Sequence, residues 1–302
     1  MNFEGKVAIV TGSAGGLGRS HAKALAARGA WVVVNDIGPL VGIADAATPT
    51  GVVAAEILKA GGTAVAYTCD VTAGGDVDRM VADTIARWGR VDILINNAGI
   101  LRDKSFAKMD LVSFGRVVDV HLMGAVNCTK AVWPHMVTQG YGRILMTTSA
   151  SGIYGNFGQS NYGAAKSALV GLMNVLAIEG EAKGIRVNSL APTAATQMTA
   201  GLIEEEILDL LTPESISPGA LFLVSDEAPT KTILAAGAGV FAVAQMHESE
   251  GHYLPDFARS AEDVAAHWAE ISDMATPVNT ASAFDQTKRY AERVLAQTMV
   301  AS

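Results

Sequence analysis

The sequence predicts an α/β fold in which a parallel β-sheet is covered by helices on both faces and followed by a C-terminal helical extension. Short runs rich in β-branched residues alternate with segments that have the apolar period of an amphipathic helix. The strand segments are almost continuously apolar, as is typical of strands buried on both faces. Repeated strand–helix units of this kind predict a doubly wound, Rossmann-type sheet with right-handed crossovers.

Six segments are expected to form strands: 6–12, 30–36, 63–70, 91–99, 142–150 and 185–192. Between them, helical periodicity is clear in 18–29 and 162–178. The Gly/Pro-containing stretch 37–50 predicts a surface loop before a helix that starts near Thr50. We therefore expect a catalytic domain over residues 1–245. Beyond it, two helical patterns with no following strand predict a helical extension over residues 246–302.

The composition excludes several classes of protein. A formal net charge of -8 and a pI near 5.2 argue against nucleic-acid binding, because a polyanion would be repelled. The N-terminal apolar run is short and meets glycine at once, unlike a signal peptide or a membrane anchor. Cys69 and Cys128 give neither a disulfide framework nor metal-ligand spacing. We expect a cytoplasmic protein with no metal and no membrane association.

The segment "VTGSAGGLGRS" follows the first predicted strand and opens a helix, with glycines spaced as T-G-x-x-x-G-x-G. Glycines there let the backbone approach a pyrophosphate, whose charge is favoured at a helix N-terminus. A tight strand-to-helix turn without a ligand is the alternative. The expected cofactor-binding residues of this segment are Gly12, Ser13, Gly16, Leu17 and Gly18.

Asp36 ends the second predicted strand, 24 residues after Gly12. A carboxylate at that distance accepts hydrogen bonds from the adenosine ribose and repels a 2'-phosphate, which favours NAD over NADP. If Asp36 is only a solvated strand-end residue, the preference stays open.

Ser149, Tyr162 and Lys166 are the predicted catalytic residues. In a helix, Tyr162 and Lys166 lie one turn apart on the same face, where the ammonium is expected to lower the pKa of the phenol from its usual value near 10. Tyr162 would then exchange a proton while the Ser149 hydroxyl holds the substrate oxygen. This trio suits interconversion of a carbinol and a carbonyl with a nicotinamide cofactor.

These motifs, with "NNAG" at 96–99 and "NSLAP" at 188–192, resemble the short-chain dehydrogenase/reductase family. The resemblance implies an NAD(P)-dependent oxidoreductase in which Tyr162 is the acid/base, Lys166 also binds the nicotinamide ribose and Ser149 orients the substrate. It further implies contacts with the cofactor from Asp70, Val71, Asn97, Ala98, Gly99, Pro192, Ala194, Ala195 and Thr196.

Details such as "NNAGILRDKSFAKM" and "SASGIYGNFGQSNY" resemble one branch, the (3R)-hydroxyacyl-CoA dehydrogenase units of peroxisomal multifunctional enzymes. That branch implies oxidation of a (3R)-hydroxyacyl-CoA, with a bulky or steroid side chain as a further option. The alternatives are a 17β-hydroxysteroid dehydrogenase, a 3-oxoacyl carrier-protein reductase and a non-catalytic NAD sensor. A CoA substrate would need basic residues near the pocket, and the candidates are Arg102, Lys104, Lys108 and Arg259.

His121 stands where much of the family has an asparagine that helps to hold a relay water. Two roles stay open for it: a proton relay, since imidazole titrates near 6.5, or a packed helix histidine with one satisfied nitrogen.

The resemblance also implies a homodimer or homotetramer that pairs through helices around 104–135 and 162–180. We expect the extension to pack over a substrate entrance, either its own or that of a partner subunit. Asp103 and Lys104 either rim that entrance or lie in a solvated loop.

Overall fold

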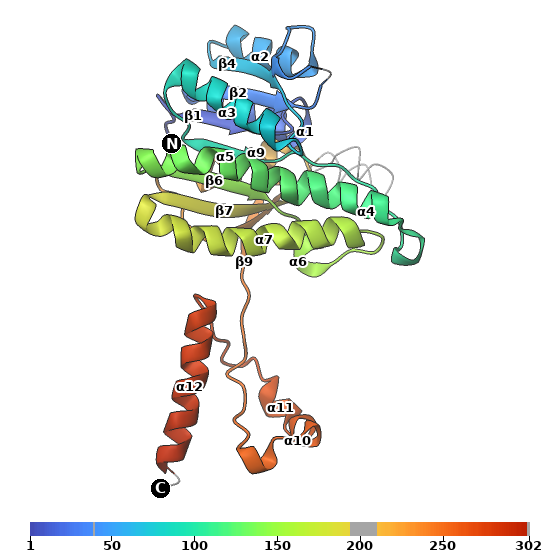
Figure 1. Cartoon of the computed structure of the whole chain (residues 1–302), viewed down its shortest axis with the longest axis vertical. Coiled ribbons are helices and arrows are strands. Elements are labelled where there is room, and N and C mark those ends of the chain that lie inside the picture. The colour runs from blue at the N-terminus through green and yellow to red at the C-terminus, as the bar shows by residue number, and fades with distance from the viewer. Residues whose placement is uncertain (39, 194–209, 301–302) are drawn as a thin grey trace. The chain divides into compact units, whose positions relative to one another are not determined.

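The computed structural model describes residues 1–38, 40–193 and 210–300. These residues form two compact units, Met1–Ala244 and Gln245–Ser302. The first unit contains a central sheet with helices on both faces, and the second contains helices joined by loops (Figure 1).

The strands described in the first unit form one sheet in the order β3-β4-β2-β1-β5-β6-β7-β8-β9. Neighbouring strands are parallel, except that β3 pairs with β4 and β8 with β9 in antiparallel fashion. The strand order reverses at β1, which has β2 on one side and β5 on the other. In doubly wound sheets, ligands bind beyond the carboxyl ends of the strands at such a switch point. The strands are β1 (Val7–Val10), β2 (Trp31–Asp36), β3 (Gly42–Ile43), β4 (Thr63–Thr68), β5 (Ile93–Asn96), β6 (Gly142–Thr147), β7 (Ile185–Pro192), β8 (Ile233–Gly237) and β9 (Val240–Ala244).

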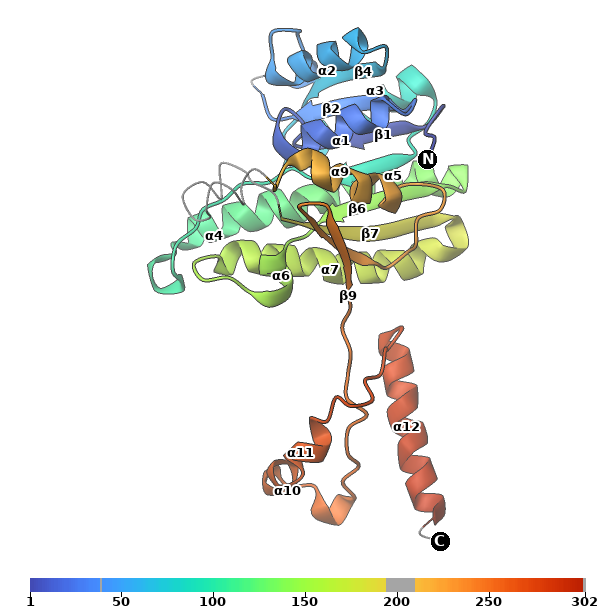
Figure 2. The same ribbon diagram turned by 180° about the vertical axis from the view of Figure 1, so that it is seen from behind.

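Helices cover both faces of this sheet. One face packs against α1, α2 and α9, and the other against α3, α5 and α7 (Figures 1 and 2). Strand β1 is fully buried between them, with Ala8 and Val10 in one apolar core and Ile9 in the other. This arrangement confirms the predicted fold. The helices are α1 (Gly16–Ala26), α2 (Pro49–Lys59), α3 (Gly74–Trp88), α4 (Leu111–Val118), α5 (Gly124–Gln139), α6 (Ala150–Tyr154), α7 (Ser160–Gly180) and α9 (Pro213–Leu223).

All six predicted strands are present, but three others were not predicted. Strand β3 has only two residues and lies within the stretch expected to be a loop. Strands β8 and β9 are joined by a tight turn in which Ala238 and Gly239 both have positive φ, at 50° and 76°. Such turns usually carry Asn-Gly or Asp-Gly. Because this turn has alanine in the first position, the sequence did not indicate a hairpin.

The helix expected from about residue 104 begins only at Leu111. Asp110 ends the preceding loop and caps α4, because its carboxylate accepts the Ser113 N–H at 2.7 Å. Between α4 and α5 the helix passes through a π-helical turn, η2 (Asp119–Met123). Single π-helical turns are frequent at functional sites.

The second unit contains α10 (Ala261–Ala266), α11 (Trp268–Ile271) and α12 (Ala283–Val300), so the helical pattern of residues 261–272 is split at His267. A capping box between Ser260 and Asp263 starts α10. Among residues 245–296, whose side chains are described, none is classed as buried, and Phe257 and Trp268 are 91% and 61% exposed. In the described parts of the whole chain, no helix has both the length and the apolar character to cross a bilayer.

Candidate active site

The structure brings Ser149, Tyr162 and Lys166 together beyond the carboxyl end of β6. The predicted strand 142–150 is too long, because β6 stops at Thr147. Ser149 lies beyond the strand and is the N-cap of α6, with its Oγ accepting the Ser151 N–H at 3.2 Å. Tyr162 and Lys166 lie in the first two turns of α7. The Ser149 hydroxyl is close enough to Tyr162 to act on the pKa of its phenol.

Lys166 is buried, with 3% of its surface exposed. Its ammonium donates a hydrogen bond to the carbonyl of Thr147 and lies 5.5 Å from the centre of the Tyr162 ring. Burial lowers the pKa of Lys166 from 10.5 to about 7, so the side chain is poised to gain or lose a proton near neutral pH.

The predicted lowering of the Tyr162 pKa was wrong in direction. Burial raises the pKa of this phenol from its usual value, since an anionic phenolate is poorly solvated there. The hydrogen bond with Ser149 lowers it, the charge of Asp103 raises it, and burial prevails. Tyr162 is therefore a protonated acid at neutral pH.

His121 lies in the π-helical turn, with its ring nearly perpendicular to the Tyr162 ring. Its Nε2 is 2.8 Å from the carbonyl oxygen of Ile100 and 3.1 Å from the Ile100 nitrogen, whereas Nδ1 has no hydrogen-bond partner among the described residues. Burial, reinforced by the charge of Lys166, lowers the pKa of His121 from 6.5 to about 3. The imidazole is therefore neutral near pH 7, with one nitrogen beside Ile100 and the other without a partner among the described residues.

Gly99 has no room for a side chain because His121 fills the space. A Cβ at this position would lie 2.3 Å from Cε1 of the imidazole. The glycine therefore shapes the position of His121, which is a role the sequence did not reveal.

The glycine-rich segment has the backbone that a pyrophosphate requires. Gly12 and Gly16 have φ values of 63° and 50°. A Cβ on Gly18 would lie 2.3 Å from the carbonyl oxygen of Gly12. The N-terminus of α1 has no side-chain cap, so its N–H groups fit an anionic ligand.

Three other predicted residues hold the turn or the helix that follows it. Ser13 is fully buried: its N–H donates to Asn35 O at 2.8 Å and its hydroxyl to Val10 O at 2.8 Å, so neither donor is left for a ligand. Asn97 donates from Nδ2 to the carbonyls of Thr11 and Gly12, both at 3.0 Å. Leu17 packs against the apolar core beneath α1.

Asp36 lies at the end of β2, beside the glycine-rich turn. One carboxylate oxygen accepts the Ala14 N–H at 3.1 Å and the other accepts the Ile37 N–H at 2.8 Å. These bonds hold the carboxylate at the place where an adenosine ribose is expected.

The remaining predicted cofactor residues follow three other strands. Asp70 accepts the N–H and hydroxyl of Thr72 at 2.9 and 2.8 Å, and Val71 is buried. Ala98 donates its N–H to the Thr11 hydroxyl at 3.1 Å. Pro192 ends β7. Ala194, Ala195 and Thr196 lie outside the described residues.

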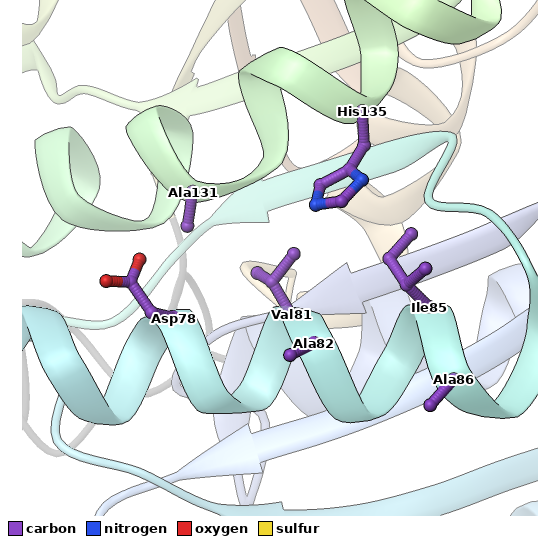
Figure 3. Close-up of a pocket in the computed structure, with 7 residues that line it drawn as sticks. All are labelled: Asp78, Val81, Ala82, Ile85, Ala86, Ala131 and His135. Atoms are coloured by element: carbon purple, nitrogen blue, oxygen red, sulfur yellow. The ribbon is translucent and has the colours of Figure 1, made fainter.

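Two hollows differ in their relation to these residues. A tight crevice without room for a water molecule lies beside the catalytic residues, and Thr11, Asn96, His121 and Lys166 are among the residues that line it. A wider groove lies between α3 and α5, lined by Asp78, Val81 and Ile85 from α3 and by Ala131 and His135 from α5 (Figure 3). That groove contains no predicted site residue. Within the described ranges, no cluster of three or more His, Cys, Asp or Glu could hold a metal ion.

The family model of the short chain dehydrogenases matches residues 6–207 of the chain. The chain belongs to this family. As a short-chain dehydrogenase it is an oxidoreductase that acts on hydroxyl groups and uses a nicotinamide cofactor. The expected family is thereby confirmed.

The relatives agree with the expected branch. Peroxisomal multifunctional enzyme A of Dictyostelium discoideum is 43% identical over 285 residues, covering 94% of this chain and 64% of that protein. The structure of full-length peroxisomal multifunctional enzyme type 2 from Drosophila melanogaster is 35% identical with a TM-score of 0.83, covering 98% of this chain and 50% of that chain. The chain thus spans about half to two thirds of the length of these multifunctional proteins.

A third similar structure is a 7α-hydroxysteroid dehydrogenase complexed with NADH and 7-oxo glycochenodeoxycholic acid. It is 32% identical with a TM-score of 0.70 and covers 79% of this chain and 95% of that chain.

Proposed function

We propose that the chain oxidises a (3R)-hydroxyacyl-CoA to the 3-oxoacyl-CoA with NAD. The observation that carries this proposal is the meeting of Ser149, Tyr162 and Lys166 at one end of the sheet, in a chain similar to peroxisomal multifunctional enzymes. NAD, when bound, accepts the hydride from the carbinol carbon.

The side chains of this site handle the proton. The Ser149 hydroxyl holds the substrate oxygen, and the Tyr162 phenolate takes the hydroxyl proton as the carbon loses its hydride. In the reverse direction, the protonated phenol gives its proton to the carbonyl oxygen. Because burial raises the Tyr162 pKa, oxidation should speed up as pH rises and more phenolate forms.

The choice of NAD rests on Asp36. Its carboxylate is fixed beside the glycine-rich turn by the N–H groups of Ala14 and Ile37. A ribose 2'-hydroxyl can donate to that carboxylate, whereas a 2'-phosphate would be repelled by it.

The choice of a CoA thioester rests on one edge of the site. Residues 101–108 carry Arg102, Lys104 and Lys108, and Lys104 pairs with Gln159 in an isolated parallel bridge. That bridge sets the basic segment beside Phe157, which is 90% exposed. Cations for phosphates next to exposed aromatic surface suit an acyl-CoA. Lys104 is partly neutralised by Asp110 at 3.4 Å, and Arg259 belongs to the second unit.

A steroid alcohol is the second candidate, favoured by the likeness to the 7α-hydroxysteroid dehydrogenase. We also propose a homodimer or homotetramer that pairs through the apolar outer face of α7, where Val175 and Ile178 are 54% and 53% exposed.

A substrate panel tests this function. NADH or NADPH absorbance is followed with (3R)- and (3S)-3-hydroxyacyl-CoA thioesters, the acyl-carrier-protein thioester and steroid alcohols. We expect the highest kcat/KM for NAD with a (3R)-hydroxyacyl-CoA. A higher value for a steroid or a carrier-protein thioester would reassign the substrate. Cofactor binding with no turnover of any alcohol would indicate an NAD sensor.

A further inference from the structure

Gln159 connects three segments near the catalytic residues through its side-chain amide. Its Oε1 accepts hydrogen bonds from the Ser151 hydroxyl at 2.7 Å and from Asn156 Nδ2 at 3.1 Å. Its Nε2 donates to a carboxylate oxygen of Asp103 at 2.7 Å. Only one orientation of the amide satisfies all three partners, since a carboxylate can only accept.

The partners of Gln159 belong to the parts of the chain that carry the chemistry. Ser151 is in α6 and donates its N–H to the Ser149 hydroxyl. Gln159 itself is the residue before α7, three positions ahead of Tyr162. Asp103 lies in the segment between β5 and α4 that follows the predicted cofactor contacts.

Neighbouring bonds hold the backbone of this segment but do not reach α6. The Lys104 N–H donates to Gly158 O at 2.9 Å, and Asn161 Nδ2 donates to Arg102 O at 3.0 Å. The Gln159 amide alone, among the bonds described here, joins Asp103 and Ser151 at once.

We propose that Gln159 is a positioning residue, whose amide keeps the Ser149 turn, the start of α7 and the Asp103 segment in a single arrangement. A substrate oxygen can then meet the Ser149 hydroxyl and the Tyr162 phenol together. The inference rests on the proposed function, because it assigns Gln159 a part in that reaction. Its physical basis is that a displacement of about 1 Å in a catalytic group can cost about a hundredfold in rate.

The sharpest variant is Gln159→Glu, which keeps the size of the side chain and its acceptors for Ser151 and Asn156. It replaces the donor toward Asp103 by a second carboxylate oxygen, so two like charges face each other. We expect KM for the hydroxyacyl-CoA to rise at least about tenfold, while the Kd for NADH stays within about twofold.

The double variant Gln159→Glu with Asp103→Asn restores a donor and acceptor pair in the reverse direction. KM should return to within about threefold of the wild-type value. The single variant Asp103→Asn is measured as well, because a double-mutant cycle needs both single variants. Gln139→Glu is the matched control, because the Gln139 amide bonds the backbone of Val91 at 2.8 and 3.1 Å, away from the catalytic residues. That control should lower thermal stability without changing KM.

Hydrogen exchange followed by mass spectrometry gives a readout that does not depend on turnover. Amides in residues 103–108 should exchange faster in Gln159→Glu and regain protection in the double variant. Unchanged KM and exchange in Gln159→Glu, or a double variant that recovers neither, would overturn the inference. If the wild-type protein turns over no (3R)-hydroxyacyl-CoA, the proposed function fails, while the exchange series still decides the role of Gln159.

Discussion

The rings of His121 and Tyr162 meet in a T-shaped arrangement, with 5.1 Å between ring centres and 87° between ring planes. This geometry is a favourable one for two aromatic rings. The Nε2 atom of His121 also contacts the backbone of Ile100, the residue that follows Gly99. His121 therefore connects the phenol of Tyr162 to this segment. The orientation of Tyr162 thus depends on space left by a glycine on another element.

Gly99→Ala tests this dependence. The added Cβ would overlap the imidazole at 2.3 Å and push His121 from Tyr162, so kcat should fall at least about tenfold with the fold retained. Steady-state kinetics and circular dichroism measure the two properties. Gly115→Ala is the control, because a Cβ there meets no atom within 4 Å and should leave kcat unchanged. Equal kcat in both variants would contradict the account.

Acid should destabilise the fold through two buried histidines. Burial lowers the pKa of His21 to about 4 and that of His121 to about 3, against about 6.5 in an unfolded chain. Below pH 6.5 both histidines become protonated in the unfolded chain, whereas in the folded chain they stay neutral until a lower pH. The free energy of unfolding should therefore fall by about 1.4 kcal/mol per pH unit for each histidine.

Urea unfolding measured at about pH 7.5 and about pH 5 checks this slope, with an expected loss of about 2 kcal/mol per histidine at the lower pH. His21→Gln should remove about half of the pH dependence. A His21→Gln protein as sensitive to acid as the wild type would show that His21 does not contribute.

Asp103→Asn should shift the pH dependence of oxidation toward lower pH. The charge of Asp103 raises the pKa of Tyr162, so its removal lets the phenolate form at a lower pH. The profile of kcat against pH measures the shift. Because Asp103 is exposed, salt should shrink the difference between the two profiles. A shift toward higher pH would refute the assigned direction.

Asp36→Ala should relax the choice of cofactor. Removing the carboxylate takes away the ribose acceptor and the repulsion of a 2'-phosphate, so the ratio of kcat/KM for NAD to that for NADP should fall at least about tenfold. Kinetics with both cofactors give this ratio. An unchanged ratio would mean that Asp36 does not set the preference.

Features that depend on apolar periodicity and on the spacing of motif residues could be predicted from the sequence. Six buried strands and the meeting of Ser149, Tyr162 and Lys166 followed from those signals. The β8–β9 hairpin was missed because its turn places Ala238 where Asn or Asp is usual.

Properties that depend on burial could not be read in the same way. The direction of the Tyr162 pKa was wrong, because the cost of desolvating a phenolate appears only when the surrounding chain is in place. Gln159 was missed for a similar reason, since its partners at 103, 151 and 156 are gathered only by the fold.

The central claim is that the Tyr162 hydroxyl transfers the proton of the reaction. It is tested most directly by NADH formation from a (3R)-hydroxyacyl-CoA in Tyr162→Phe, compared with Tyr290→Phe, which alters a half-exposed tyrosine in α12. We predict that kcat falls at least about a hundredfold in Tyr162→Phe alone, with the Kd for NADH retained. A kcat within about threefold of wild type in Tyr162→Phe would contradict the claim.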